Sequence, residues 1–131
     1  MRPLRVLLVE SDEAAAERLL GLLRSGGLGL SVESVTELAP ALSHLSRGGT
    51  DVVILSLDLP DSQGLGTFER MCAFAPDVPV VVVTREEDEE LALASVQGGA
   101  QDFLVHTQVT PAVLSRALRY AVERHRLLSA L

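Results

Sequence analysis

The chain has 131 residues, 47% of them hydrophobic, which is enough apolar material for one compact core and too little length for two. Its 18 acidic and 11 basic residues give a formal net charge of −7, so the chain as a whole should be repelled by nucleic acid phosphates and anionic lipid surfaces. Composition therefore predicts a single domain, residues 1–131, that binds neither nucleic acid nor membrane.

Cysteine content and hydropathy indicate in which cellular compartment the protein is expected. The single cysteine, Cys72, excludes an internal disulfide, and we expect it to pack as a small core hydrophobe. No apolar run approaches the roughly 20 residues that cross a bilayer, and the first ten residues end too acidic for a signal peptide. These features predict a cytoplasmic protein.

Short apolar runs rich in β-branched residues alternate with helical patterns, which is typical of repeated βαβ units and a parallel sheet. We expect strands at residues 5–9, 30–34, 51–55, 78–83 and 102–105, and helices near residues 13–25, 37–47, 65–74, 87–97 and 111–130. Right-handed crossovers would stack them into a single doubly wound (βα)5 sandwich of the α/β class with a five-stranded parallel sheet. Any ligand should bind at the carboxyl ends of the strands.

Helix ends have their own signals. Glycine pairs at residues 26–27, 48–49 and 98–99 stand just after predicted helices, where we expect left-handed residues. Thr110 followed by Pro111 predicts an N-cap and the first position of the last helix.

The last predicted helix differs from the rest of the chain in charge. Residues 111–131 carry four arginines against Glu123, whereas the acidic run at residues 86–90 should form the solvated first turn of a helix or an acidic docking patch. An apolar stripe at heptad-like spacing follows Leu114, Leu118, Ala121, His125 and Leu128. The stripe predicts either an amphipathic helix packed on the sheet or one that also dimerises or continues into another domain.

Four segments place polar residues at the predicted strand ends. They are LLVESD (7–12), DVVILSLDLPDSQGL (51–65), VVVVT (80–84) and GGAQDFLVH (98–106). In order and spacing they resemble the receiver domain of two-component response regulators over essentially the whole chain. The resemblance implies a flavodoxin-like (CheY-like) fold and a module of phosphorelay signal transduction rather than an enzyme.

The family's phosphotransfer chemistry uses five positions. Two acidic residues after the first strand hold Mg²⁺, an aspartate ending the third strand accepts a phosphoryl group from a histidine kinase, and a hydroxyl residue and a lysine grip that group. By this resemblance, Glu10 matches the first acidic position and Thr84 the hydroxyl position. Phe103 matches an aromatic position that accompanies them, so Thr84 and Phe103 are the switch-like residues.

The remaining chemical positions have changed. Ser11 stands at the second acidic position, Ser56 at the phosphoacceptor position and His106 at the lysine position. A serine hydroxyl needs a base before it attacks, so aspartyl phosphorylation at position 56 is excluded. Loss of two carboxylates predicts weak Mg²⁺ binding, with Glu10 and Asp12 as the remaining candidate ligands, and no other cofactor.

Arg85, next to the hydroxyl position, offers a charge that could partly replace the lysine. We expect its guanidinium to contact an anion in the pocket, or to fold over the pocket and pair with Glu10, Asp12 or Asp58. The acidic pocket would then be Glu10, Ser11, Asp12 and Asp58.

The sequence therefore predicts an atypical receiver, a pseudo-receiver, that works through protein contacts without aspartyl phosphorylation. Three alternatives stay open. Asp58 or Asp12 takes over as phosphoacceptor or metal ligand with Mg²⁺, a serine kinase phosphorylates Ser56, or Ser56, His106 and Glu10 form a hydrolytic triad.

Partner contacts follow from the same resemblance. Receivers commonly use the face made by the fourth helix, fifth strand and fifth helix, where we expect either a protein partner or a second copy of the chain. The expected contact residues are Ala92, Val96, Arg116, Arg119 and Tyr120. The end of the chain also resembles receivers whose last helix, here near residues 111–130, continues into an output domain.

Overall fold

The computed structural model describes residues 3–26 and 29–131. In chain order its main elements are β1 (Leu4–Val9), α1 (Glu13–Ser25), β2 (Leu30–Val35), α2 (Leu38–Leu45), β3 (Val52–Ser56), α3 (Leu65–Phe74), β6 (Val80–Thr84), α4 (Glu89–Gln97), β7 (Asp102–Val105) and α5 (Pro111–Ser129). Each predicted helix and strand is therefore present, with some ends shifted by one or two residues along the chain.

Two small elements were not predicted. A hairpin of β4 (Asp58–Leu59) and β5 (Ser62–Gln63) follows β3, and a 3-10 turn, η1 (Glu86–Asp88), precedes α4. The acidic run at residues 86–90 therefore forms η1 and the start of α4.

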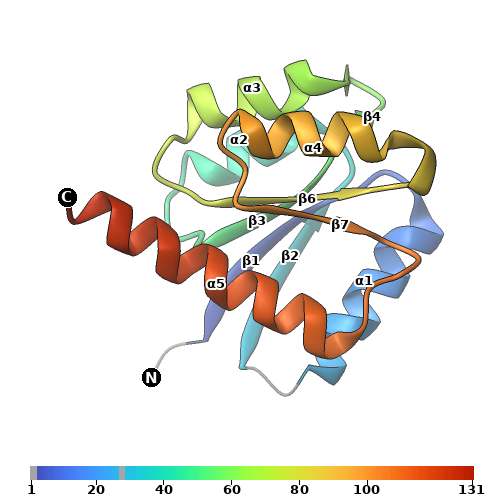
Figure 1. Ribbon diagram of the computed structural model, residues 1–131, viewed down its shortest axis with the longest axis horizontal. Helices are drawn as coiled ribbons and strands as arrows, with labels where there is room; N and C mark the ends of the chain where they lie inside the picture. The colour runs from blue at the N-terminus through green and yellow to red at the C-terminus, as the bar shows by residue number, and fades with distance from the viewer. Residues whose placement is uncertain (1–2, 27–28) are drawn as a thin grey trace.

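The main sheet has five parallel strands in the order β2-β1-β3-β6-β7. Helices α2, α3 and α4 cover one face, and α1 and α5 cover the other (Figure 1). This confirms the predicted doubly wound, flavodoxin-like fold. The strand order reverses between β1 and β3, and in open α/β sheets ligands bind at the carboxyl ends of the strands beside such a reversal.

Alternation along the strands divides the core into two layers. In β1, Leu7 and Val9 pack toward α2, α3 and α4, whereas Val6 and Leu8 pack toward α1 and α5. All five residues of β3 are buried, since helices cover both of its faces. The polar residues that follow these strands are therefore held at one edge of a rigid sheet.

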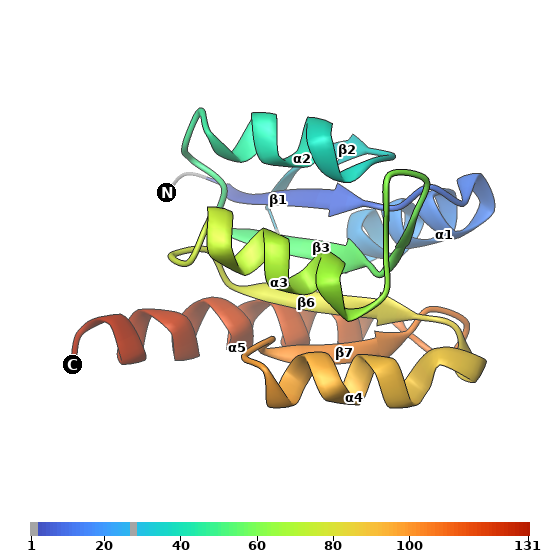
Figure 2. The same cartoon turned by 90° about the horizontal axis from the view of Figure 1, so that it is seen from above.

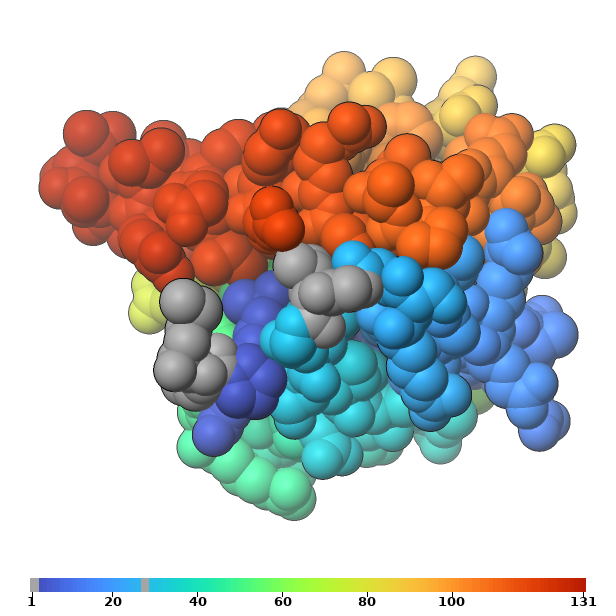
Figure 3. Space-filling view, turned by 90° about the horizontal axis from the view of Figure 1, so that it is seen from below, coloured from blue at the N-terminus to red at the C-terminus, as the bar shows by residue number. Residues whose placement is uncertain are grey.

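Helices α1 and α5 lie side by side on one face of the molecule (Figure 3). A Cβ atom on Gly26 would stand 2.2 Å from Oγ of Ser115 in α5. Gly26 itself has an ordinary right-handed φ of −76°, so it is not the left-handed residue expected of this pair, and the close approach to Ser115 explains a glycine at this position. Its neighbour Gly27 lies outside the described residues.

The other two glycine pairs agree with the prediction. Gly48, Gly49 and Gly99 have positive φ, so each pair supplies a left-handed residue after its helix, and Gly98 has a φ of −86°. At the start of α5, Thr110 accepts a hydrogen bond from the N–H of Val113, which confirms the predicted N-cap.

The apolar stripe of α5 has two halves. Leu114, Leu118 and Ala121 are buried against the sheet, but Leu128 keeps 63% of its surface exposed. The last turns of α5 extend beyond the end of the sheet (Figure 2). Packing on the sheet is thus the role of the first half, and dimerisation or continuation of the second half stays a prediction. Within the described part of the chain, no helix is both long and apolar enough to span a bilayer.

Candidate functional site

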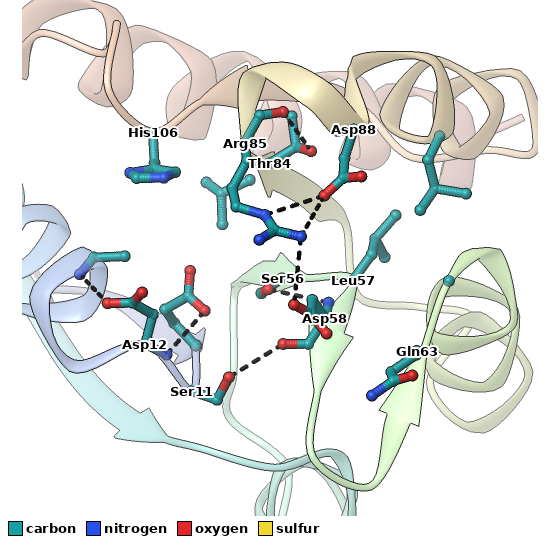
Figure 4. A pocket seen from close by; sticks show the side chains of 15 residues that line it. Ser11, Asp12, Ser56, Leu57, Asp58, Gln63, Thr84, Arg85, Asp88 and His106 are labelled. Carbon is teal, nitrogen blue, oxygen red and sulfur yellow. Dashed lines mark hydrogen bonds and ion pairs between the residues drawn. The ribbon is translucent and has the colours of Figure 1, made fainter.

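A cavity of about 250 Å³ opens at the carboxyl ends of β1, β3, β6 and β7 (Figure 4). Its lining includes Glu10, Ser11, Asp12, Ser56, Asp58, Thr84, Arg85, Asp88 and His106. The structure thus brings together all the residues singled out around the pocket except Phe103. That side chain is partly buried and packs against the core layer under α2, α3 and α4.

Ser56 is the last residue of β3 and is only 6% exposed. Its Oγ accepts a hydrogen bond from the N–H of Asp58 at 3.2 Å. The hydroxyl oxygen is therefore buried and already engaged by the backbone of the following hairpin.

Glu10 follows β1 and lies beside Ser56 across the point where the strand order reverses. Burial raises the pKa of its carboxyl group, and hydrogen bonds from Asp12, Ser56 and Ser11 offset part of that effect. Its Oε2 accepts from the N–H of Asp12 at 3.4 Å. Glu10 thus binds a proton more readily than an exposed glutamate does.

The two residues after Glu10 have structural partners of their own. The Ser11 hydroxyl donates to the backbone carbonyl of Asp58 at 3.1 Å, and Asp12 Oδ1 caps α1 by accepting from the N–H of Ala15 at 3.0 Å. Mg²⁺ requires several anionic or carbonyl oxygens directed at one point. Across residues 3–26 and 29–131, no three side chains among His, Cys, Asp and Glu come together in a way that could hold a metal ion. These residues do not fit the divalent cation that the resemblance implies.

Arg85 lies over the mouth of the cavity, between Asp88 and Asp58 (Figure 4). Its Nη2 is 3.0 Å from Asp88 Oδ2 and 3.6 Å from Asp58 Oδ2, and its Nε is 3.6 Å from Glu87 Oε1. The hydrogen bond to Asp88 is the main reason that the pKa of Arg85 is raised. Of the expected partners, Asp58 pairs with Arg85, whereas Glu10 and Asp12 do not.

The strongest partner, Asp88, was missed by sequence reasoning. Arg85 and Asp88 are three residues apart, a spacing that brings side chains together in a helical turn, so the signal was present. It was overlooked because the acidic run was interpreted as a solvated first turn or a docking patch, and neither interpretation pairs its residues with Arg85.

Thr84 is the last residue of β6, and His106 directly follows β7. The Thr84 hydroxyl donates to the backbone carbonyl of Arg85 at 3.1 Å. The backbone of His106 is held in place, because its N–H donates to the carbonyl of Thr84 and its carbonyl accepts from Arg18 Nε at 2.8 Å. Its Nδ1 is buried without a hydrogen-bond partner in the described structure. No hydrogen bond links His106 to Ser56 or Glu10 in the described structure, so the three do not form the relay of a hydrolytic triad.

The predicted partner face includes one residue that the structure excludes. Ala92 is 0% exposed because α4 turns it into the core, so our expectation that it contacts a partner was wrong. Val96 is partly buried, whereas Arg116, Arg119 and Tyr120 are exposed.

Comparisons with known proteins agree with this architecture. Residues 6–119 match the response regulator receiver domain. The chain is 33% identical over 113 residues to the swarming motility regulation protein RssB of Serratia marcescens, which spans 86% of this chain and 51% of that protein. It is 30% identical over 122 residues to the C4-dicarboxylate transport transcriptional regulatory protein DctD of Rhizobium meliloti, which spans 93% of this chain and 26% of that protein. The chain thus covers between about a quarter and a half of the length of these relatives.

Solved structures show the same fold. The signal receiver domain of an HD domain-containing protein from Pseudomonas fluorescens superimposes with a TM-score of 0.83 at 26% identity, covering 99% of this chain and 94% of that one. A receiver domain protein from Clostridium thermocellum gives a TM-score of 0.81 at 23% identity, covering 95% and 98% of the two chains. Because the family match covers nearly all of the sheet and helices, the chain belongs to the response regulator receiver domains of two-component signalling.

Proposed function

We propose that this receiver domain is a pseudo-receiver, which transmits signals through protein contacts without aspartyl phosphorylation. The observation that carries the proposal is the state of Ser56. It ends β3 where the family resemblance places the acceptor, it has no carboxylate, and its buried hydroxyl oxygen accepts a hydrogen bond from the N–H of Asp58. A serine at this position cannot form the acyl phosphate that an aspartate forms, whatever base lies beside its hydroxyl.

The geometry of Asp58 argues against a displaced acceptor. Asp58 begins β4, pairs with Gln63 of β5, and keeps 62% of its side chain exposed at the mouth of the cavity. Its carboxylate is paired with Arg85, and phosphoryl transfer requires the attacking oxygen in line with the leaving group beside a bound cation. Asp12, the other candidate, already caps α1.

For output, we propose the edge of the sheet formed by β7 with α4 and α5. This edge carries charges of both signs, the acidic residues 86–90 before and within α4 and the exposed Arg116 and Arg119 on α5. Such a surface can complement a second copy of itself, so the first partner to test is another molecule of this chain. Tyr120, 57% exposed, adds a large aromatic side chain on the same helix as Arg116 and Arg119.

The phosphorylation proposal is tested by intact mass after incubation with acetyl phosphate and Mg²⁺. The variants are Ser56→Asp, which restores the acceptor carboxylate, and Asp58→Asn, which removes the displaced candidate. We expect the wild-type mass to stay unchanged and Ser56→Asp to gain a phosphoryl group. A wild-type gain that Asp58→Asn abolishes would overturn the proposal in favour of a displaced acceptor.

Phosphorylation of Ser56 by a serine kinase is distinguished by chemistry. Hydroxylamine cleaves an acyl phosphate and leaves a serine phosphate ester intact, so protein purified from its native host is compared by mass before and after treatment. We expect unmodified Ser56, because the buried hydroxyl is inaccessible to a kinase. A hydroxylamine-resistant phosphate at Ser56 would contradict the proposed mode of signalling.

The output surface is tested by sedimentation velocity over a concentration series. We expect association of the wild type that weakens with salt and is lost in the double variant Arg116→Glu, Arg119→Glu. The double variant Arg24→Glu, Arg47→Glu, at exposed positions in α1 and after α2, is the matched charge reversal and should associate as the wild type does. A monomer at every concentration would exclude the second copy as the partner at this surface.

A further inference from the structure

Three carboxylates surround the guanidinium of Arg85. Asp58 comes from the hairpin after β3, Glu87 and Asp88 come from η1, and the distances to Arg85 are 3.6, 3.6 and 3.0 Å. We propose that this guanidinium is the resident cation of the site. It supplies the positive charge that a divalent metal ion would bring, and it ties the segment after β3 to the segment after β6.

The chemistry of the neighbouring positions explains why a guanidinium suits this place. Ser11 and Ser56 are neutral, and the carboxylate of Asp12 is used to cap α1. The carboxylates of Asp58 and Asp88 at the mouth of the cavity come from different elements, and both face Nη2 of Arg85, so a positive charge already stands between them. A planar guanidinium carries five donors and can reach two carboxylates on separate segments.

Glu86, the residue after Arg85, makes its contacts toward β7 instead of toward β3. Glu86 Oε1 accepts hydrogen bonds from Gln108 Nε2 at 3.2 Å and from Thr107 Oγ1 at 3.4 Å, both in the loop between β7 and α5. Two consecutive residues after β6 thus hold the loop on either side, Arg85 toward β3 and Glu86 toward β7. The loops around the cavity are connected by side chains of this chain alone.

This inference deepens the proposed function and rests on it in one respect, because a receiver without a phosphoryl group needs another source of order in these loops. The contacts are half exposed, and individual exposed ion pairs contribute little to the free energy of unfolding. Their effect should therefore be local, on the opening of two loop segments, and hydrogen exchange reports local opening directly.

The experiment is hydrogen-deuterium exchange by mass spectrometry on the wild type, Arg85→Gln and Arg85→Lys. Arg126→Gln is the matched control, since Arg126 also pairs with a carboxylate three residues away, Glu123 at 3.1 Å, but far along α5. We expect Arg85→Gln to raise exchange about two- to fivefold in both residues 57–64 and residues 85–91, the size that follows from exposed ion pairs. Arg85→Lys should recover only part of the protection, because lysine keeps the positive charge but lacks the planar set of donors of a guanidinium. Arg126→Gln should leave the exchange of both segments as in the wild type.

A second arm adds Mg²⁺ to each protein at constant ionic strength. We expect no change in the wild type, because the guanidinium already supplies the positive charge. Unchanged exchange of residues 57–64 in Arg85→Gln, or protection of the wild-type loops by Mg²⁺, would overturn the inference. No phosphoryl donor is present, so a failure here is separate from a failure of the acetyl phosphate experiment.

Discussion

The carboxylate of Asp61 caps helix α2 by accepting a hydrogen bond from the N–H of Leu38 at 2.8 Å, across 23 residues of chain. Its second oxygen accepts from the N–H of Ala39 at 2.9 Å. Glu37 occupies the local N-cap position but makes no side-chain hydrogen bond. The tip of the β4–β5 hairpin therefore satisfies the first N–H groups of α2, and the position of the hairpin depends on that helix.

We expect Asp61→Asn to destabilise the fold at neutral pH, because the variant keeps one acceptor oxygen and loses the charge that favours a helix N-terminus. The two backbone hydrogen bonds lower the pKa of Asp61 below its ordinary value of 3.8. The contribution of Asp61 is therefore present above pH 3.8 and is lost as the pH falls through the lowered pKa of the folded state.

Urea unfolding at a series of pH values checks this prediction. The midpoints of the wild type and Asp61→Asn should differ at neutral pH and converge in acid. Asp77→Asn, which changes an exposed aspartate in the α3–β6 loop, controls for loss of one negative charge. Equal effects of the two substitutions at neutral pH would show that Asp61 acts only through net charge.

Glu10 predicts a pH dependence of the opposite sign. Burial raises the pKa of its carboxyl group above the ordinary value of 4.5, so the folded state holds this proton more tightly than the unfolded chain does. Its contribution to stability should therefore fall as the pH rises above 4.5 and through the raised pKa. We expect Glu10→Gln to flatten the wild-type decline over that range. A decline of the same slope in the variant, measured by urea midpoints, would assign it to other groups.

The apolar stripe on α5 predicts that a leucine-to-alanine substitution lowers the free energy of unfolding by different amounts in its two halves. Leu118 is 0% exposed and Leu128 is 63% exposed. Leu118→Ala should lower the free energy of unfolding by about 2–5 kcal/mol, as expected for a cavity in a packed core. Leu128→Ala should change it by less than about 0.5 kcal/mol in the monomer. Chemical denaturation at low protein concentration measures both, and a large cost at Leu128 would mean that a second chain covers it.

The elements that the sequence predicted correctly are those with strong periodic signals. Buried strands such as β3 read as continuous apolar runs, and Thr110 with Pro111 marked the start of α5 to the residue. The β4–β5 hairpin was missed because each strand has two residues, too few to show any alternation. Ala92 was wrongly predicted to be exposed, because alanine occurs on both the buried and the exposed sides of helices. Only the packing of α4 decides which side is buried.

The candidate site could likewise be predicted only in part. Strand ends placed Glu10, Ser56 and Thr84 at one edge of the sheet, because parallel strands share a direction. The partners of Arg85 and Asp61 depend on how loops fold back, and no local pattern states which of several nearby acids a side chain will reach.

Two glycines with equal space around them give the last prediction. A Cβ atom on Gly21, inside α1, or on Gly99, after α4, would meet no heavy atom within 4 Å, so packing does not separate them. Gly99 has a φ of +121°, which L-residues rarely adopt, whereas Gly21 is helical. Gly21→Ala should therefore stabilise the fold by roughly 0.5–1 kcal/mol. Gly99→Ala should destabilise it by about 1–3 kcal/mol. Denaturant midpoints of the two variants should move in opposite directions, and a shift in the same direction would contradict the backbone conformation of the α4–β7 turn.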